Sequence, residues 1–141
     1  MLVSADYRQL EVRLMAHFSS DALLREILFG DQDVFRAIAS KWLVRSIDTI
    51  SNAERARAKG LCYGVLYGMG TQALGQQLGC SKEDAAEALA NFKATFCGIT
   101  AFLGSVIQSC EKDGFVTTLL GRRRSIPGIF SQVMGERKRA E

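Results

Sequence analysis

The most constraining feature of this sequence is a row of four side chains at a strict spacing of four residues. The row consists of Arg55, Lys59, Tyr63 and Tyr67, two cations followed by two phenols. Four residues turn an α-helix by about 400°, so the row drifts slowly around one helix face over about 18 Å. Guanidinium and ammonium groups suit phosphates, and an aromatic ring offers a stacking surface for a base or sugar. The row therefore fits an elongated ligand such as a nucleoside triphosphate.

Three glycines repeat beside the row at the same spacing, at Gly60, Gly64 and Gly68. A glycine inside a helix costs about 1 kcal/mol relative to alanine, so we expect a close approach along this flank. A competing interpretation places Tyr63 and Tyr67 in the core with their apolar neighbours and leaves the cations solvated. Spacing alone does not separate the two interpretations.

The composition is typical of one globular domain with a hydrophobic core. The 141 residues are 48% hydrophobic, and no apolar run approaches the roughly 18 residues that a membrane span needs. The first six residues contain neither a basic segment nor a cleavable apolar one, so we expect an intracellular protein with no membrane partner. Four widely spaced cysteines without a CxxC pair predict reduced core thiols rather than disulfides or a zinc site.

The positive charge is concentrated near the C-terminus. Residues 122–141 contain six basic and two acidic residues, a net charge of +4, which leaves −1 on the first 121 residues. Such an excess is compatible with contact to a polyanion, although charge clusters are more often solvated surface.

Capping residues and apolar periodicity predict an α+β fold that is mostly α. Leu2–Ala5 is interpreted as a strand that presents Asp6 at its end. Seven helical segments and one hairpin are expected after it: 10–18, 20–29, 33–43, 51–67, 71–78, 81–112, the hairpin near 115–126, and a basic helix from Met134. A strand without a partner cannot satisfy its edges, and the last helix is short, so we expect a piece of a larger fold.

Three segments resemble motifs of the family A DNA polymerases. DYRQLEVR at Asp6–Arg13 resembles motif A, and RARAKGLCYGVLYG at Arg55–Gly68 resembles motif B. LLGRRRSIPGI at Leu119–Ile129 resembles the GRRR hairpin of the same family. The order of the motifs matches as well. DVFRAIASKW at Asp33–Trp42 and GFVTTLLGRRRSIPGI at Gly114–Ile129 look most like the theta branch.

The resemblance implies a template-directed DNA polymerase that transfers a nucleotidyl group from a dNTP to a primer 3′-hydroxyl. It implies two Mg²⁺ ions, primer-template DNA and dNTP as partners, and the remainder of a polymerase chain with the thumb and the rest of the palm. Residues 1–18 would be a palm strand and helix, about 19–113 the fingers, and about 114–141 the palm hairpin with the start of a helix. The theta-like segments imply a role in DNA repair and a nuclear location.

The resemblance also assigns roles to single residues. Asp6 would be a catalytic carboxylate that binds Mg²⁺, and Lys59 would bind the triphosphate and protonate the leaving pyrophosphate. The other expected nucleotide-binding residues are Gln9, Glu11 as a gate against a ribose 2′-hydroxyl, Arg55, Tyr63 and Tyr67. The expected DNA-binding residues are Tyr67, Gly68, Arg122, Arg123 and Arg124.

Departures from the family pattern keep a second function open. Arg8 stands where motif A usually has a serine, next to Asp6. No HDE-type motif C with the second catalytic carboxylate is found, and the single histidine, His17, lies close behind motif A. The alternative is therefore a truncated, non-catalytic fragment that only binds nucleotide or DNA. A helical interaction module with fortuitous motifs is the third possibility.

Overall fold

The computed structural model describes residues 1–140 and divides the chain into two compact units. The first unit ends at Ile99 and the second begins at Thr100. Glu141, the last residue of the predicted region 114–141, lies outside the described residues. The expected boundaries near residues 18 and 113 separate palm from fingers, whereas the boundary after Ile99 separates two compact units. The palm and fingers boundaries therefore stay predictions.

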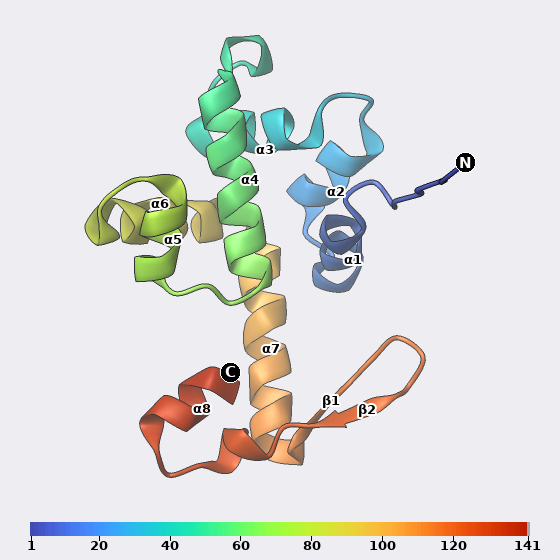
Figure 1. Ribbon diagram of the computed structural model, residues 1–141, viewed down its shortest axis with the longest axis vertical. Coiled ribbons are helices and arrows are strands. Elements are labelled where there is room, and N and C mark those ends of the chain that lie inside the picture. Colours follow the sequence, from blue (N-terminus) through green and yellow to red (C-terminus); the bar gives the residue numbers. More distant parts are fainter. Residues whose placement is uncertain (141) are drawn as a thin grey trace. The chain divides into compact units, whose positions relative to one another are not determined.

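All regular elements of the first unit are helices. Its elements are α1 (Leu10–Ser19), α2 (Ala22–Phe29), α3 (Val34–Leu43), the 3-10 helix η1 (Ile47–Thr49), α4 (Asn52–Leu66), α5 (Thr71–Leu78), α6 (Lys82–Thr95) and the first residues of α7 (Cys97–Asp113). Helix α4 lies at the centre and contacts α1, α3, α5 and α6 (Figure 1). Because α4 carries the predicted row, its neighbours decide where the row points.

Local capping explains where the central helices begin. Ser51 and Glu54 form the predicted capping box at the start of α4, with both reciprocal hydrogen bonds present. Asp33 caps α3 by accepting a hydrogen bond from the Arg36 N–H at 2.9 Å. Gly79 ends α5 in the left-handed conformation, with φ of 66°, as its sequence position predicted. These signals are local, which is why the sequence located them.

The core of the first unit collects large apolar side chains from six of its helices, α1 to α6. Helix α4 contributes Leu61, and its buried face also includes Val65. The largest fully buried side chains of the described residues are Phe92, Phe96, Leu24, Ile38, Leu61, Leu74 and Val12. The core therefore surrounds one side of α4 and leaves another side for the row.

The glycine flank of α4 is explained by helix packing. A Cβ at Gly60 would lie 2.9 Å from Cδ2 of Leu78, and one at Gly64 would lie 3.0 Å from Cδ1 of Leu74. Both leucines belong to α5, so the two glycines let α5 approach α4 closely. Gly68 differs: its φ is +64° and nothing lies within 4 Å of its Cβ position. Only this third glycine serves the backbone turn after α4.

The second unit contains the rest of α7 and the predicted hairpin. Strands β1 (Phe115–Thr117) and β2 (Arg123–Ser125) pair antiparallel, with Val116 opposite Arg124. Gly121, with φ of +82°, lies in the connecting loop. The hairpin is followed by the 3-10 helix η2 (Pro127–Phe130) and by α8 (Met134–Ala140). The mostly α fold with a small hairpin and the basic helix from Met134 are thus confirmed.

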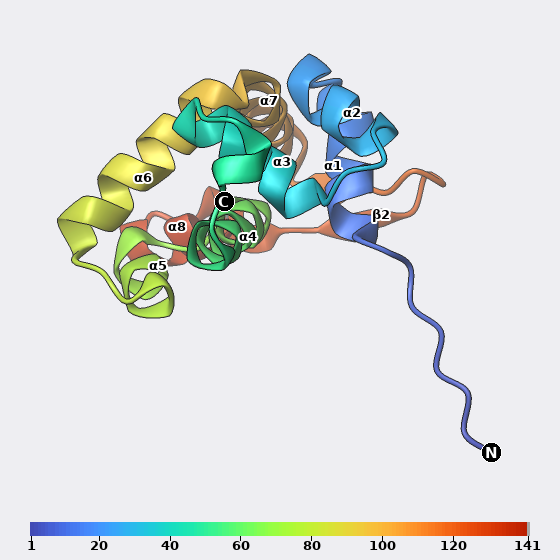
Figure 2. The same ribbon diagram turned by 90° about the horizontal axis from the view of Figure 1, so that it is seen from above.

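Three local predictions were wrong. Leu2–Ala5 forms no strand: residues 1–7 have no regular secondary structure, and Figure 2 draws them as an extended trace rather than an arrow. The sheet of the described residues consists of β1 and β2, and a β-strand needs a partner. Helix α2 is capped by Asp21 rather than Ser20, because the Asp21 carboxylate accepts the Leu24 N–H at 2.9 Å. The expected long helix is broken at Phe96, whose ψ of 62° ends α6 before α7 begins.

The structure also tests the expectations about the cysteines and about a membrane span. All four cysteines are free, but only Cys62 and Cys110 are buried, and Cys97 is exposed. The prediction of core thiols therefore holds for two of them. Within residues 1–140 no single helix has the length and apolar character to cross a membrane. Helices α6 and α7 meet these two criteria only when taken together, and the pair is bent by 96°.

Candidate functional site

Helix α4 has a buried face and a more exposed face, and the predicted row lies on the second. Arg55 and Tyr63 are half-buried, whereas Lys59 and Tyr67 are exposed. The competing core interpretation is correct for Leu61 and Val65, which are buried, but wrong for Tyr67, which is exposed, and Tyr63 lies between the two. We call Arg55, Lys59, Tyr63 and Tyr67 the α4 row.

Arg55, at the start of the row, is held by a carboxylate from α3. Its Nε donates to Oδ1 of Asp33 at 2.9 Å, and its Nη2 donates to Oδ2 at 2.8 Å. This bidentate pair lowers the pKa of Asp33, chiefly through the hydrogen bond from Arg55, and the same bond raises the pKa of Arg55. The guanidinium therefore has a fixed orientation.

A second residue of α3, Phe35, lies against three members of the row. The ring centroid is 5.8 Å from Cζ of Arg55 and 5.7 Å from Nζ of Lys59. The ring of Tyr63 lies 6.0 Å away at an angle of 48°. The two cations are within the range of cation–π attraction, about 0.5–1 kcal/mol at exposed sites. One buried ring thus contacts both cations and the first phenol.

The aromatic half of the row is a pair of stacked phenols. The rings of Tyr63 and Tyr67 lie 6.1 Å apart with an interplanar angle of 10°. The Tyr67 hydroxyl donates a long hydrogen bond of 3.5 Å to Oε1 of Glu11, in α1. The pKa of Tyr63 is raised, first by burial and then by the negative charge of Glu11, with a smaller contribution from Asp6. Motif A and motif B residues therefore meet here.

The segment before α1 places the remaining motif A residues. Asp6 is exposed in the extended segment, and Gln9 occupies the N-cap of α1 in a left-handed conformation with φ of 49°. Oε1 of Gln9 is buried and has no hydrogen-bond partner among residues 1–140. A buried amide oxygen normally has a partner. Arg8, the departure from motif A, accepts a hydrogen bond on its backbone oxygen from Nε of Arg13 at 2.9 Å.

The predicted DNA-binding arginines lie in the second unit. Arg122, Arg123 and Arg124 are all exposed, at the end of the hairpin loop and along β2. Cζ of Arg123 lies 4.6 Å from the ring centroid of Phe115, across the hairpin. The hairpin thus presents three neighbouring cations to the surroundings.

The chain matches known proteins along its whole length. The sequence profile of DNA polymerase family A matches residues 1–141. The chain belongs to DNA polymerase family A. It is 44% identical to DNA polymerase theta of Mus musculus over 129 residues, 92% of this chain and 5% of that protein. It is 38% identical to DNA polymerase I of Mycobacterium tuberculosis over 140 residues, 99% of this chain and 16% of that protein.

A solved structure supports the fold. The polymerase domain of Pol1 from M. smegmatis, in complex with DNA primer-template and dNTP, superimposes with a TM-score of 0.88 at 36% identity. The match covers 96% of this chain and 24% of that chain. The resemblance read from the three motifs is therefore confirmed, including its theta-like character. The chain spans less than a fifth of the length of the two polymerases named above.

Two residues of this site were not identified from the sequence. Asp33 and Phe35 were interpreted as parts of an ordinary packing helix, yet they contact the cationic half of the row. Asp33 has the pattern of an N-cap, and Phe35 belongs to the apolar stripe of α3. A hydrophobic stripe does not say which polar residues of another helix lie beside it, so no local signal revealed these contacts.

The described residues alone do not fit a complete two-metal site. No group of three or more His, Cys, Asp or Glu side chains that could hold a metal is found within residues 1–140. The Asp6 carboxylate is the type of ligand that Mg²⁺ prefers, and it is the one metal ligand that the motifs predict.

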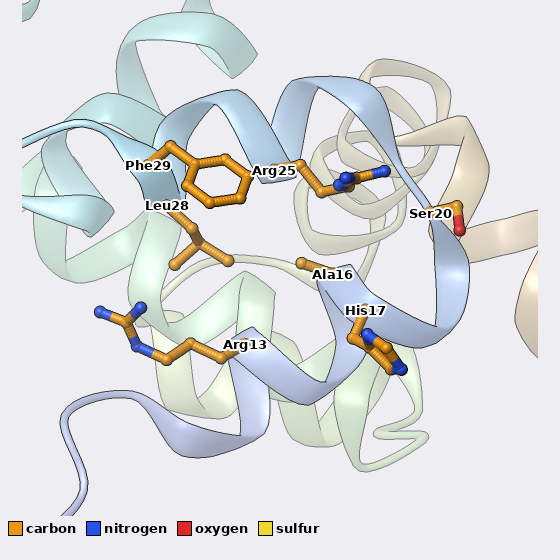
Figure 3. A pocket seen from close by; sticks show the side chains of 7 residues that line it. All are labelled: Arg13, Ala16, His17, Ser20, Arg25, Leu28 and Phe29. Atoms are coloured by element: carbon orange, nitrogen blue, oxygen red, sulfur yellow. The ribbon is translucent and has the colours of Figure 1, made fainter.

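A cleft of about 420 Å³ lies between α1 and α2, apart from the row (Figure 3). Arg13, Ala16 and His17 line it from α1, while Arg25, Leu28 and Phe29 line it from α2, with Ser20 between them. No member of the α4 row lines this cleft. The row is therefore a separate surface on α4, and nucleotide recognition need not involve the cleft.

Proposed function

We propose that this chain supplies the nucleotide-binding helix and part of the active site of a DNA-directed DNA polymerase. The observation that carries the proposal is the α4 row, with fixed cations at one end and stacked phenols at the other. The solved relative that contains dNTP and primer-template supports the same assignment. The reaction is nucleotidyl transfer from the dNTP to the 3′-hydroxyl of a primer.

The cationic half of the row suits the triphosphate. Arg55 and Lys59 lie about 6 Å apart along α4, a spacing that follows from four residues at 1.5 Å each. The positive end of the α4 dipole adds to their attraction for phosphate. Lys59 is exposed and carries three N–H donors. We assign it the further role of donating a proton to the departing pyrophosphate.

The aromatic half suits the sugar and base. Tyr63 would stack on the incoming nucleotide, and Tyr67 would lie by the template base. Glu11 contacts the Tyr67 hydroxyl, so its side chain lies beside the phenols, where a gate against a ribose 2′-hydroxyl would act. Gln9 would line the nucleotide or the minor groove, and its buried Oε1 has no hydrogen-bond partner among residues 1–140.

Arg122, Arg123 and Arg124 would contact the phosphate backbone of the primer-template, because exposed arginines bind phosphate without reading sequence. Gly68 would let the chain turn away from the template. Asp6 would supply one carboxylate to Mg²⁺, and the other ligands would come from outside residues 1–140. The rest of the palm and the thumb are expected partners of this chain.

The theta relative carries the finer proposal of a role in DNA repair and a nuclear location. The alternative function is a chain that binds nucleotide or DNA without catalysis. Magnesium-dependent primer extension by residues 1–141 alone would remove the alternative. We expect no extension, because the proposed site takes its other metal ligands from outside residues 1–140.

The test of nucleotide binding is a titration of dTTP with the chain, followed by ³¹P NMR. We expect the wild-type chain to broaden the phosphate signals, and Lys59→Ala to raise the Kd by about tenfold, the effect of one lost charge-assisted contact. Lys41→Ala, which removes a surface lysine paired with Glu26, is the matched control and should leave the Kd unchanged. Equal Kd values for Lys59→Ala and the wild type, with both folded by circular dichroism, would contradict the assignment.

A further inference from the structure

We propose that Asp33 and Phe35 are positioning residues that fix the direction and spacing of the two phosphate-binding cations of the α4 row. Both residues belong to the start of α3, and together they contact Arg55, Lys59 and Tyr63. The inference rests on the proposed function, because it assigns the row to a nucleotide. It adds two residues to which the resemblance assigned no role.

Asp33 fixes Arg55 because the carboxylate is itself fixed. Its Oδ1 accepts the Arg36 backbone N–H at 2.9 Å as the cap of α3, and the same oxygen accepts Nε of Arg55 at 2.9 Å. The carboxylate therefore cannot rotate without uncapping the helix. The pair uses the Nε and Nη2 edge of the guanidinium, which leaves the Nη1 group for a phosphate oxygen.

Phe35 fixes the spacing of the cations because it lies against both of them. Its side chain is only 3% exposed, so its ring is held by the core rather than by the row. Free lysine and arginine side chains each lose about 1.5–2 kcal/mol of rotamer entropy when they are fixed by a ligand. Because the Phe35 ring already limits the rotation of both side chains, less rotamer entropy is left to lose when the nucleotide binds.

Charge alone predicts the opposite effect for Asp33. A carboxylate beside a triphosphate repels it, so removal of the Asp33 charge would tighten binding if the side chain had no positioning role. Loss of positioning would weaken binding. The direction of the change in Kd therefore distinguishes charge repulsion from positioning. A change in the stability of the fold alone would not shift the Kd in either direction.

The experiment measures the Kd of dTTP for the chain of residues 1–141 by ³¹P NMR. Asp33→Asn removes the charge and retains a good N-cap, and Phe35→Leu retains apolar burial without the aromatic face. We expect each to raise the Kd by about tenfold relative to the wild type. In ¹⁵N-labelled chain, the Nε–H signal of Arg55, sheltered by Asp33, should also disappear by faster exchange in Asp33→Asn.

Two matched controls change the same chemistry away from the row. Glu26→Gln neutralises a carboxylate that pairs with Lys41 at 3.1 Å on the surface. Phe92→Leu removes a ring that is 2% exposed and packs on Trp42 and Phe96. Both should bind dTTP with a Kd within about twofold of the wild type, a change of under about 0.4 kcal/mol. If Phe35→Leu does not fold, Phe35→Met takes its place, because methionine fills irregular core space.

The outcomes separate this inference from the function on which it rests. Wild-type binding together with an unchanged or lower Kd in Asp33→Asn would overturn the positioning role of Asp33. A Kd for Phe35→Leu or Phe35→Met that equals the Phe92→Leu value would overturn the role of Phe35. If the wild-type chain fails to bind dTTP, the proposed function itself is overturned, whereas loss of binding in the Lys59→Ala variant alone leaves that function intact.

Discussion

The α4 row and the arginine hairpin use the same kind of charge in different ways. In the row, Arg55 is fixed by two hydrogen bonds to Asp33 and Lys59 lies over a buried ring. In the hairpin, three consecutive arginines are exposed at the end of the loop and along β2, a strand of three residues. A cation with one orientation suits a ligand of defined shape, whereas exposed cations suit the uniform backbone of nucleic acid. The difference predicts different ligands for the two regions.

The cause of the difference is the surroundings of each element. Helix α4 has helices on several sides, so side chains from α3 and α1 reach its row (Figure 1). The hairpin carries Arg122 at the end of a loop that contains Gly121, and Arg123 and Arg124 on the short strand β2. The comparison is therefore tested by removing the cations of each region in turn and measuring the binding of both ligands.

The largest expected effect is the loss of dNTP binding when both row cations are removed. Arg55→Ala combined with Lys59→Ala should raise the Kd for dTTP by about a hundredfold, the product of two charge-assisted contacts. Replacement of Arg122, Arg123 and Arg124 by glutamine should leave that Kd nearly unchanged. The same ³¹P titration measures both variants. A similar loss of dTTP binding in both would show that net charge, rather than the fixed row, binds the nucleotide.

The second expected effect is weaker binding of duplex DNA by the triple glutamine variant of the hairpin. Each lost phosphate contact lowers the slope of log K against log salt by about 0.9. Fluorescence anisotropy at several salt concentrations should therefore give a slope smaller by up to about 2.7 units. The double row variant provides the control. An unchanged slope in the hairpin variant would remove the arginines from the DNA interface.

A smaller effect is expected at the end of the row. Gly68 has φ of +64°, and Gly70 has φ of −68°, with open space at both Cβ positions. Gly68→Ala should lower the free energy of unfolding by about 1 kcal/mol through backbone strain. Gly70→Ala should not lower it. Urea denaturation of the two variants measures the difference, and equal stabilities would mean that Gly68 is not needed for the turn.

The smallest expected effect is the pH dependence of the Asp33–Arg55 pair. The folded pKa of Asp33 is lowered below its ordinary 3.8 by the hydrogen bond from Arg55. The pair therefore stabilises the fold above pH 3.8, and this contribution is lost as pH falls through the folded pKa. With both side chains about one third exposed, the contribution is about 1 kcal/mol or less. Asp33→Asn should be less stable than the wild type at pH 7, and the difference should shrink as pH falls below 3.8; a constant difference would contradict the pair's role.

The sequence predicted the helices and the row because their signals are local. The capping box at Ser51, the glycine after α5 and the hairpin around Gly121 each depend on a few neighbouring residues. The stack of Tyr63 on Tyr67 follows from a spacing of four in one helix. The order of the three motifs identified the family.

The sequence could not predict what depends on contacts between distant segments. Asp33 and Arg55 are 22 residues apart, and no local pattern joins them. The strand expected at Leu2–Ala5 is absent. A strand depends on a partner that its own sequence does not specify, and the sheet of the described residues pairs only β1 with β2. The break at Phe96 interrupts an apolar stripe that would otherwise continue as one helix. Helix periodicity alone did not reveal it.

The most direct test of the central claim is a map of amide shifts in the ¹⁵N-labelled chain during addition of dTTP. The account predicts that the largest shifts follow the α4 row, from Arg55 through Lys59 to Tyr63 and Tyr67, with smaller ones at Asp33 and Phe35. Arg122, Arg123 and Arg124 should shift little. Shifts confined to the hairpin arginines, or no shifts along α4 at saturating dTTP, would contradict the assignment of this helix to the nucleotide.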